Sequence, residues 1–197
     1  MPISQIVTNS IANGAVVADD LAAGAALSNL GTSRLARANM PAGSVLQVVS
    51  TTKSDTFSTT SSSLIDVTGF SATITPTATS SRILVTGTVC WSVSDSVPYL
   101  AYFILVRGST PISIADAAGI RARGTVGAQG IYNTDNNVFA PLNFLDSPSS
   151  TSPTTYKIQT AVEGGRTVWV NRGAESDGDQ GITCRFVSTI TLMEVAA

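Results

Sequence analysis

The sequence predicts a mainly β protein: an antiparallel, jelly-roll-like β-sandwich preceded by an extended N-terminal arm with short helical turns. Three observations predict this fold. Ser and Thr make up about a quarter of the 197 residues, whereas charged residues are only 12%. Short runs of β-branched and aliphatic residues recur after residue 44, between connectors rich in Ser, Thr, Gly and Pro. No helical period lies between these runs, and such spacing is typical of all-β sandwiches and jelly rolls.

The arm comprises residues 1–43, which are rich in alanine and almost free of charge. Residues 11–16 align with residues 21–26 at an offset of ten, sharing an Ile/Leu-Ala-x-Gly-Ala pattern. The glycine in each unit costs a helix about 1 kcal/mol relative to alanine, which argues against one long helix. Short helical turns fit better, with Asp19 and Asp20 placed to favour a helix start before Leu21.

Pro41-Ala42-Gly43 ends the arm, because Pro and Gly interrupt regular structure. The predicted domains are therefore residues 1–43, an assembly or attachment arm, and residues 44–197, a β-sandwich. The strands expected in the second domain, in order, are 45–49, 63–67, 82–91, 99–106, 111–115, 138–145, 155–162, 167–171 and 181–195. Residues 146–154, rich in Ser and Pro, are expected to form an exposed loop.

The last expected strand has the clearest alternation. One face would carry Ile182, Cys184, Phe186, Ile190 and Leu192, opposite Thr183, Arg185, Thr189 and Thr191. This is the pattern of a strand with one buried side. Met193 and Val195 then place apolar groups on the second face, where a partner subunit or another sheet would cover them.

The charge balance excludes some partners. Lys and Arg total 11 against 13 Asp and Glu, with no basic run, so nucleic-acid binding through phosphate neutralisation is disfavoured. The N-terminus lacks a basic region followed by an apolar one, and no uninterrupted apolar stretch is long enough to span a membrane. We expect a soluble, unprocessed chain that is made in the cytoplasm and does not insert into membranes.

Most catalytic chemistry is missing from the sequence. There is no histidine, which removes Ser-His-Asp and Cys-His catalysis and most zinc sites, and no Gly-rich phosphate loop occurs. We therefore expect no catalytic residue, no metal and no cofactor. The acidic cluster Glu175-Ser176-Asp177-Gly178-Asp179 could offer oxygen ligands to Ca²⁺, but it lacks the glycine and glutamate of an EF-hand loop, so a solvated hairpin loop is favoured. No pair of carboxylates marks a glycosidase.

The two cysteines, Cys90 and Cys184, lie in apolar runs with no further metal ligand nearby. We expect both to be reduced and buried, because free cysteine packs as a small hydrophobe. A disulfide between them is the alternative.

The candidates for contact with a receptor are the aromatic residues Tyr132, Tyr99 and Trp169, since Tyr and Trp combine an apolar face with a polar tip. Trp91 and Trp169 lie within strand runs, where a core position is the favoured interpretation for each. Tyr132, beside the polar residues 133–137, is the better surface candidate.

Four segments, taken in order, carry a family resemblance: residues 41–49, 74–85, 105–112 and 188–196. The chain resembles a broad family of bacteriophage virion proteins, mostly tail fibres or fibre-like structural proteins. Residues 41–49 look like the entry to the family's C-terminal β-domain, and residues 188–196 look like its closing strand. The Asn-Gly-Ala-Val and Ala-Gly-Ala units of the arm resemble repeats of trimeric fibre shafts.

This resemblance implies a virion component, assembled in the host cytoplasm, and a homotrimer. The arm cannot bury its apolar side chains alone, but three copies around an axis can. Each buried Ile or Leu contributes roughly 1.5–3 kcal/mol, which offsets the entropy of ordering the arm. The residues expected to mediate oligomerisation or attachment to other virion proteins are Ile3, Ile6, Ile11, Val16, Leu21, Leu27 and Leu30.

The leading hypothesis is a trimeric tail fibre whose β-sandwich attaches to a host glycan or protein by multivalent, non-catalytic binding. One alternative is a trimeric capsid decoration protein, whose arm spreads over neighbouring capsid subunits. A second alternative is a tail-associated enzyme that degrades glycans.

Overall fold

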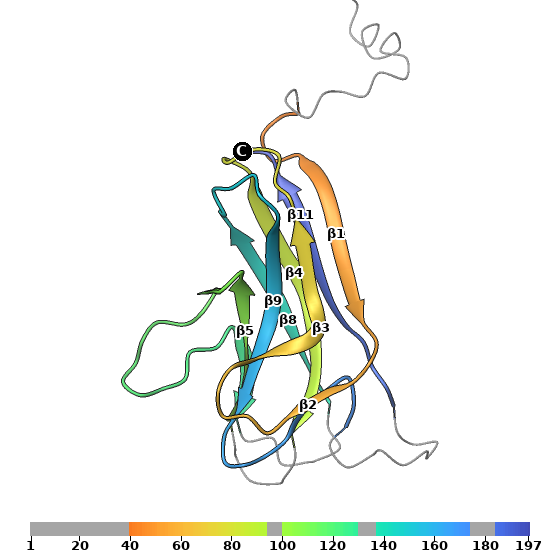
Figure 1. Cartoon of the computed structure of the whole chain (residues 1–197), viewed down its shortest axis with the longest axis vertical. Coiled ribbons are helices and arrows are strands. Elements are labelled where there is room, and N and C mark those ends of the chain that lie inside the picture. The colour runs from red at the N-terminus through yellow and green to blue at the C-terminus, as the bar shows by residue number, and fades with distance from the viewer. Residues whose placement is uncertain (1–39, 94–99, 130–136, 174–183) are drawn as a thin grey trace, which may run out of the picture. The chain divides into compact units, whose positions relative to one another are not determined.

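A computed structural model describes residues 40–93, 100–129, 137–173 and 184–197 (Figure 1). The chain divides into two compact units, Met1–Met40 and Pro41–Ala197. The first unit lies, except for Met40, outside the described residues. The predicted helical turns of the arm stay a prediction, as do its seven apolar contact positions, Ile3, Ile6, Ile11, Val16, Leu21, Leu27 and Leu30.

The second unit opens with a turn at the predicted boundary. The amide of Ser44 donates to the carbonyl of Pro41 at 3.1 Å, and Gly43 between them has φ +87°. A positive φ at the third residue is what a type II turn requires, and glycine adopts it without strain. The amide of Gly43 also donates to the carbonyl of Ala196 at 2.8 Å. The two ends of the β-domain are therefore paired with each other.

One antiparallel sheet, called sheet 1 here, has the strand order β1-β11-β4-β8. The short strand β10 pairs with residues 91–93 of β4, past the part of β4 that pairs with β11, and β2 pairs with β10. The bounds of these strands are Val45–Lys53 (β1), Phe57–Thr59 (β2), Arg82–Val93 (β4), Val138–Asp146 (β8), Val168–Val170 (β10) and Ser188–Val195 (β11).

The other antiparallel sheet, sheet 2, has the order β3-β9-β5, with β6 and β7 both paired to the free edge of β5. Its strands are Ile65–Ile74 (β3), Leu100–Arg107 (β5), Thr110–Ile112 (β6), Val126–Gln129 (β7) and Thr154–Val162 (β9). Along the chain the long strands alternate between the two sheets, so that β11 returns between β1 and β4 and β9 returns between β3 and β5. This is the connectivity of a jelly roll. The predicted antiparallel β-sandwich is confirmed.

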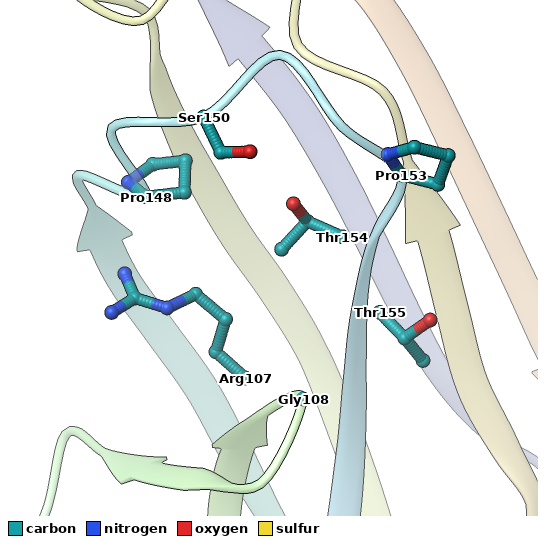
Figure 2. Close-up of a pocket in the computed structure, with 7 residues that line it drawn as sticks. All are labelled: Arg107, Gly108, Pro148, Ser150, Pro153, Thr154 and Thr155. Atoms are coloured by element: carbon teal, nitrogen blue, oxygen red, sulfur yellow. The ribbon is translucent and has the colours of Figure 1, made fainter.

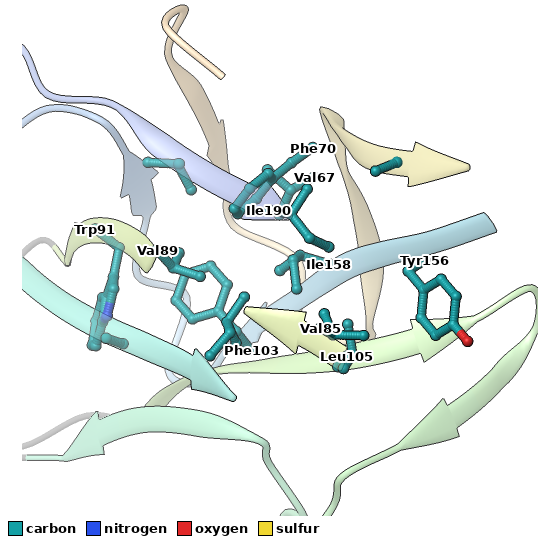
Figure 3. Packing of buried hydrophobic residues seen from close by; sticks show 14 of the residues in the cluster. Val67, Phe70, Val85, Val89, Trp91, Phe103, Leu105, Tyr156, Ile158 and Ile190 are labelled. Atoms are coloured by element: carbon teal, nitrogen blue, oxygen red, sulfur yellow. The ribbon is translucent and has the colours of Figure 1, made fainter. Parts of the chain in front are cut away.

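The core lies between the two sheets and consists of the inward side chains of both (Figure 3). Trp91 of β4 is fully buried and packs against Phe103 of β5, with the ring centroids 5.5 Å apart and the planes tilted by 56°. Such offset aromatic pairs add about 0.5–1.5 kcal/mol to the burial of the rings themselves. The interpretation of Trp91 as a core residue is confirmed.

The last strand is shorter than expected. β11 begins at Ser188, and residues 184–187 are not in a strand, since the amide of Phe186 bonds to the carbonyl of Asn171 at 3.1 Å. Within β11 the buried face is Ser188, Ile190, Leu192 and Glu194, and Met193 and Val195 lie on the other side, as expected. The prediction that Phe186 continues this buried face is wrong, because the chain leaves the ladder before reaching it.

A buried carboxylate holds the β3–β4 connection to sheet 1. Glu194 of β11 accepts hydrogen bonds from the backbone amide and the hydroxyl of Thr77, each at 2.6 Å, and from the side-chain amide of Gln47. Burial pushes the pKa of Glu194 up, but these hydrogen bonds, with one from Ser81, outweigh it and leave the pKa lowered. The carboxylate is therefore charged and held by donors.

Asn171 links the ends of three strands. Its side-chain amide donates to the carbonyls of Lys53 at 2.8 Å and Asp55 at 2.9 Å, and it accepts from the hydroxyl of Ser188 at 2.7 Å. Its φ of +65° lies in the left-handed region, which Asn tolerates better than most residues. Asn171 thus fixes where β1 and β10 end and where β11 begins.

Candidate functional site

The strand register defines two ends of the sandwich. Val45, Val195 and Ile83 lie in neighbouring rows of sheet 1 at the end where the chain enters from Met40, together with Asp146 of β8; this is the Pro41 end. At the opposite end Trp91 of β4 is paired with both Val138 and Val170, beside Trp169, so we call it the Trp169 end.

A charged cluster joins the two sheets at the Pro41 end. Nη1 of Arg107 donates to both carboxylate oxygens of Asp146, at 2.9 and 2.8 Å, and the hydroxyl of Tyr156 donates to Asp146 at 2.6 Å. Tyr156 is fully buried and Asp146 nearly so. Burial first, and then the neighbouring Asp146, raise the pKa of Tyr156 far above its usual range. The phenol therefore stays a hydrogen-bond donor, and the charge of Asp146 is balanced by Arg107.

A hollow of about 340 Å³ lies beside this cluster (Figure 2). One side is Arg107 and Gly108, where β5 turns into β6, and the other is the β8–β9 loop. Figure 2 shows Arg107 and Gly108 below the space, and Ser150 and Thr154 above it. The residues that line it are Arg107, Gly108, Pro148, Ser150, Pro153, Thr154 and Thr155. Guanidinium and hydroxyl groups can hold sugar hydroxyls or a carboxylate, but none of these residues is a general base.

The loop over the hollow is ordered by its own hydrogen bonds. The amide of Ser152 donates to the hydroxyl of Ser150 at 3.0 Å, and the hydroxyl of Thr154 donates to the carbonyl of Ser152 at 3.0 Å. The prediction of a loop over residues 146–154 is right for residues 147–153. It is wrong for Asp146, which is buried at the end of β8, and for Thr154, which begins β9.

Trp169 lies on the outer side of sheet 1 at the opposite end. Its neighbours Val168 and Val170 are buried, so the strand alternation turns Trp169 outward, where it is half-buried. The guanidinium of Arg172 lies 5.7 Å from the centroid of its ring, a cation–π arrangement worth about 0.5–1 kcal/mol when exposed. The interpretation of Trp169 as a core residue is wrong, and its place as a surface aromatic fits the receptor-contact prediction.

Tyr99 and Tyr132 lie outside the described residues. The described residues that flank their segments are at the Trp169 end: Val93 and Leu100 on either side of Tyr99, and Gln129 and Asn137 on either side of Tyr132. Leu100 is paired with Gln129, and Val93 with Val168 next to Trp169. Among the three candidates, Trp169 is the described one, and it lies at the end of the sandwich opposite the hollow.

The cysteines are both free. Cys90 is buried, and burial raises the pKa of its thiol to about 11. Cys184 is exposed, so the prediction that it is buried is wrong; it precedes the point where the chain joins β11. The acidic cluster 175–179 lies outside the described residues, and the part of the chain that the structure describes holds no group of three metal-ligating side chains.

The charged cluster beside the hollow was not predicted from the sequence. Arg107 is 39 residues from Asp146, and only the pairing of β5 with β9 and the packing of the two sheets bring it to Asp146 and Tyr156. The one available signal is Arg107-Gly108, a charged residue and a glycine at the end of a long apolar run.

Comparisons with known proteins give a weak structural likeness and no family. No family model and no curated protein match the chain. A structure of the Gt strain of infectious bursal disease virus matches with a TM-score of 0.40 and 19% identity, over 77% of this chain and 38% of that one. A structure of the Gx strain gives 0.36 and 15%, over 76% and 42%. A VP2 subviral particle of the same virus gives 0.34 and 17%, over 77% and 38%.

The chain thus spans about two fifths of the length of these solved chains. The TM-scores are too low to assign it to their family. In the described residues, no helix is long and apolar enough to cross a membrane.

Proposed function

We propose that this chain is a non-enzymatic structural protein of a virus particle, and specifically a homotrimeric bacteriophage tail fibre that attaches the particle to its host. The observation that carries the proposal is the jelly-roll strand order, β1-β11-β4-β8 over β3-β9-β5. Double-sheet jelly rolls recur in viral capsid domains and in lectins. The resemblance of the sequence to phage fibre proteins supports the same class.

The two ends of the sandwich have different roles in this proposal. The Pro41 end continues into the arm, which binds other copies and other virion proteins. The Trp169 end faces the host, with Trp169 as a contact residue for a surface glycan or protein. Tyr99 and Tyr132 are further contact candidates from the sequence alone. A single weak contact suffices, because three copies per fibre and several fibres per particle multiply the effective affinity.

The buried carboxylates support a binding role without catalysis. A glycosidase needs two carboxyl groups that face a substrate. Asp146 is instead bound to Arg107 and Tyr156, and Glu194 is bound to Thr77. Both groups stabilise the fold, and neither requires a metal or a cofactor.

The second candidate is a trimeric decoration protein of the capsid, which the jelly roll favours as well, since this fold is common in capsid domains. Antibody labelling of intact particles separates the two: a tail fibre is labelled at the tail and a decoration protein over the head. Absence of the chain from purified particles would refute both.

Host attachment is tested by competition. The purified full chain should reduce adsorption of the virus to its host, and Trp169→Ala should weaken this competition by about thirtyfold, since truncating an aromatic hot spot costs about 2 kcal/mol or more. Ile120→Ala is the matched control, because Ile120 is a fully exposed apolar residue on a different connection of the domain. Equal competition by all three proteins would refute a contact at Trp169.

A further inference from the structure

The outer face of sheet 1 carries an apolar row across four strands. Val48 of β1 pairs with Met193 of β11, which pairs with Leu84 of β4, which pairs with Leu145 of β8. Val48 is 56% exposed and Leu145 36%, with Met193 and Leu84 half-buried between them. These side chains point away from the core, so no described part of the domain covers the row.

Two rows of hydroxyl and amide side chains continue this face. The first row consists of Ser50, Thr191, Thr86 and Asn143. The second row consists of Thr52, Thr189, Thr88 and Pro141. The hydroxyls of Ser50 and Thr191 are 2.9 Å apart. A hydroxyl both donates and accepts hydrogen bonds, so such a row can pair with a copy of itself without a mismatch.

None of the twelve residues in these three rows is charged. The outer face of sheet 2 differs, since Lys157 and Asp66 form an ion pair there at 2.8 Å and Gln159 also bonds to Asp66. Charged residues make up 12% of the whole chain, and the centres of protein interfaces are depleted in charge. The three rows combine an absence of charge with exposed apolar side chains, as the centre of an interface does.

We propose that these three rows on the outer face of sheet 1 form a surface through which copies of the chain assemble, and that its occupant is a second copy. The three rows carry no like charges that would oppose one another, Arg82 of the neighbouring row lies at their margin, and the hydroxyl rows are self-complementary. From strand spacing and rise, the three rows and their margins measure about 20 by 25 Å, so two copies bury about 1,000 Å², near the lower limit for a specific interface. A face that pairs with a copy of itself has two-fold symmetry, so this contact is separate from the contacts proposed for the arm around a three-fold axis and would join two such oligomers.

This inference rests on the proposed function only in requiring an oligomer. It assigns part of the assembly to the β-domain, and it explains why Met193 lies in an apolar row that no described part of the domain covers. A different virion protein on this face is the competing occupant, and the test includes it.

The experiment compares full-length chains by sedimentation velocity over a range of concentrations. Met193→Lys should weaken association by at least about tenfold, because a charge buried without a partner is costly. The matched control is Thr73→Lys, an exposed strand residue on the outer face of sheet 2, which should associate as the unsubstituted chain does. An equimolar mixture of Met193→Lys and Met193→Glu chains should associate more tightly than either variant alone.

Four outcomes would overturn the inference: an unsubstituted chain that is monomeric, a Met193→Lys chain that associates normally, an equal loss in both lysine variants, or no recovery in the mixture. Normal association of Met193→Lys combined with failed incorporation into particles would assign the face to another virion protein. Particle labelling judges the proposed function separately, since association of the purified chain is independent of where the chain is found.

Discussion

Gly87 offers the sharpest test of the packing between β4 and β11. A Cβ atom added at this position would lie 2.1 Å from the backbone carbonyl oxygen of Thr189 and 3.1 Å from the Cα of Ile190. The nearest atoms belong to the backbone of a paired central strand, so no side-chain rotation can relieve the overlap. We expect Gly87→Ala to force β4 and β11 apart by about 1 Å and to cost about 1–3 kcal/mol, as other overpacked core substitutions do.

The assay is urea unfolding followed by the fluorescence of buried Trp91, with thermal unfolding alongside. Each kcal/mol should lower Tm by about 2–4 °C for a domain of this size, and the urea dependence of the free energy of unfolding should not change. The control is Thr86→Ala, which removes a side chain of the same strand from the outer face. A Gly87→Ala protein as stable as the unsubstituted chain would refute the close approach of the two strands.

Three further predictions concern polar groups. The pKa of Glu194 is lowered in the folded protein, so its charged form stabilises the fold fully above the ordinary pKa of 4.5, and this stabilisation is lost as the pH falls below that value. Glu194→Gln should therefore lessen the decline in the free energy of unfolding between about pH 5 and 3. Parallel pH curves for the variant and the unsubstituted chain would contradict this. Asn171→Ala removes the hydrogen-bond partner of the Lys53 and Asp55 carbonyls and of the Ser188 hydroxyl. It should lower the free energy of unfolding in urea by about 2–4 kcal/mol. The control Asn143→Ala, at an exposed position, should lower it by under about 0.5 kcal/mol. A thiol reagent should modify Cys184 rapidly in the folded protein and Cys90 only after unfolding; two rapid thiols would contradict the burial of Cys90.

The sequence was sufficient for features that depend on local alternation. Ile190 and Leu192 face the core because every second residue of a strand points the same way, and this holds wherever the strand pairs. The rule does not say which of the two faces of a strand is buried. In Val168-Trp169-Val170 either the valines or the tryptophan could face the core, and the structure buries the valines.

Features that depend on pairing could not be predicted. The alternation through Cys184 and Phe186 continues that of β11, but a hydrogen bond to Asn171 draws this segment out of the ladder. The short strands β2 and β7 exist because β10 and β5 provide an edge for them. Strands of both sheets contribute to the cluster of Arg107, Asp146 and Tyr156, so no local sequence pattern predicts it.

The pairing of Gly43 with Ala196 has a consequence for how the protein can diversify. The first and last strands of the β-domain are paired at one end, and the described connection between β9 and β10, residues 163–167, lies at the other end between two paired strands. Lengthening such a connection is inexpensive, since doubling a loop adds only about 0.6 kcal/mol of closure entropy. The sandwich can therefore accept insertions and deletions at the Trp169 end without altering either its core or its junction with the arm.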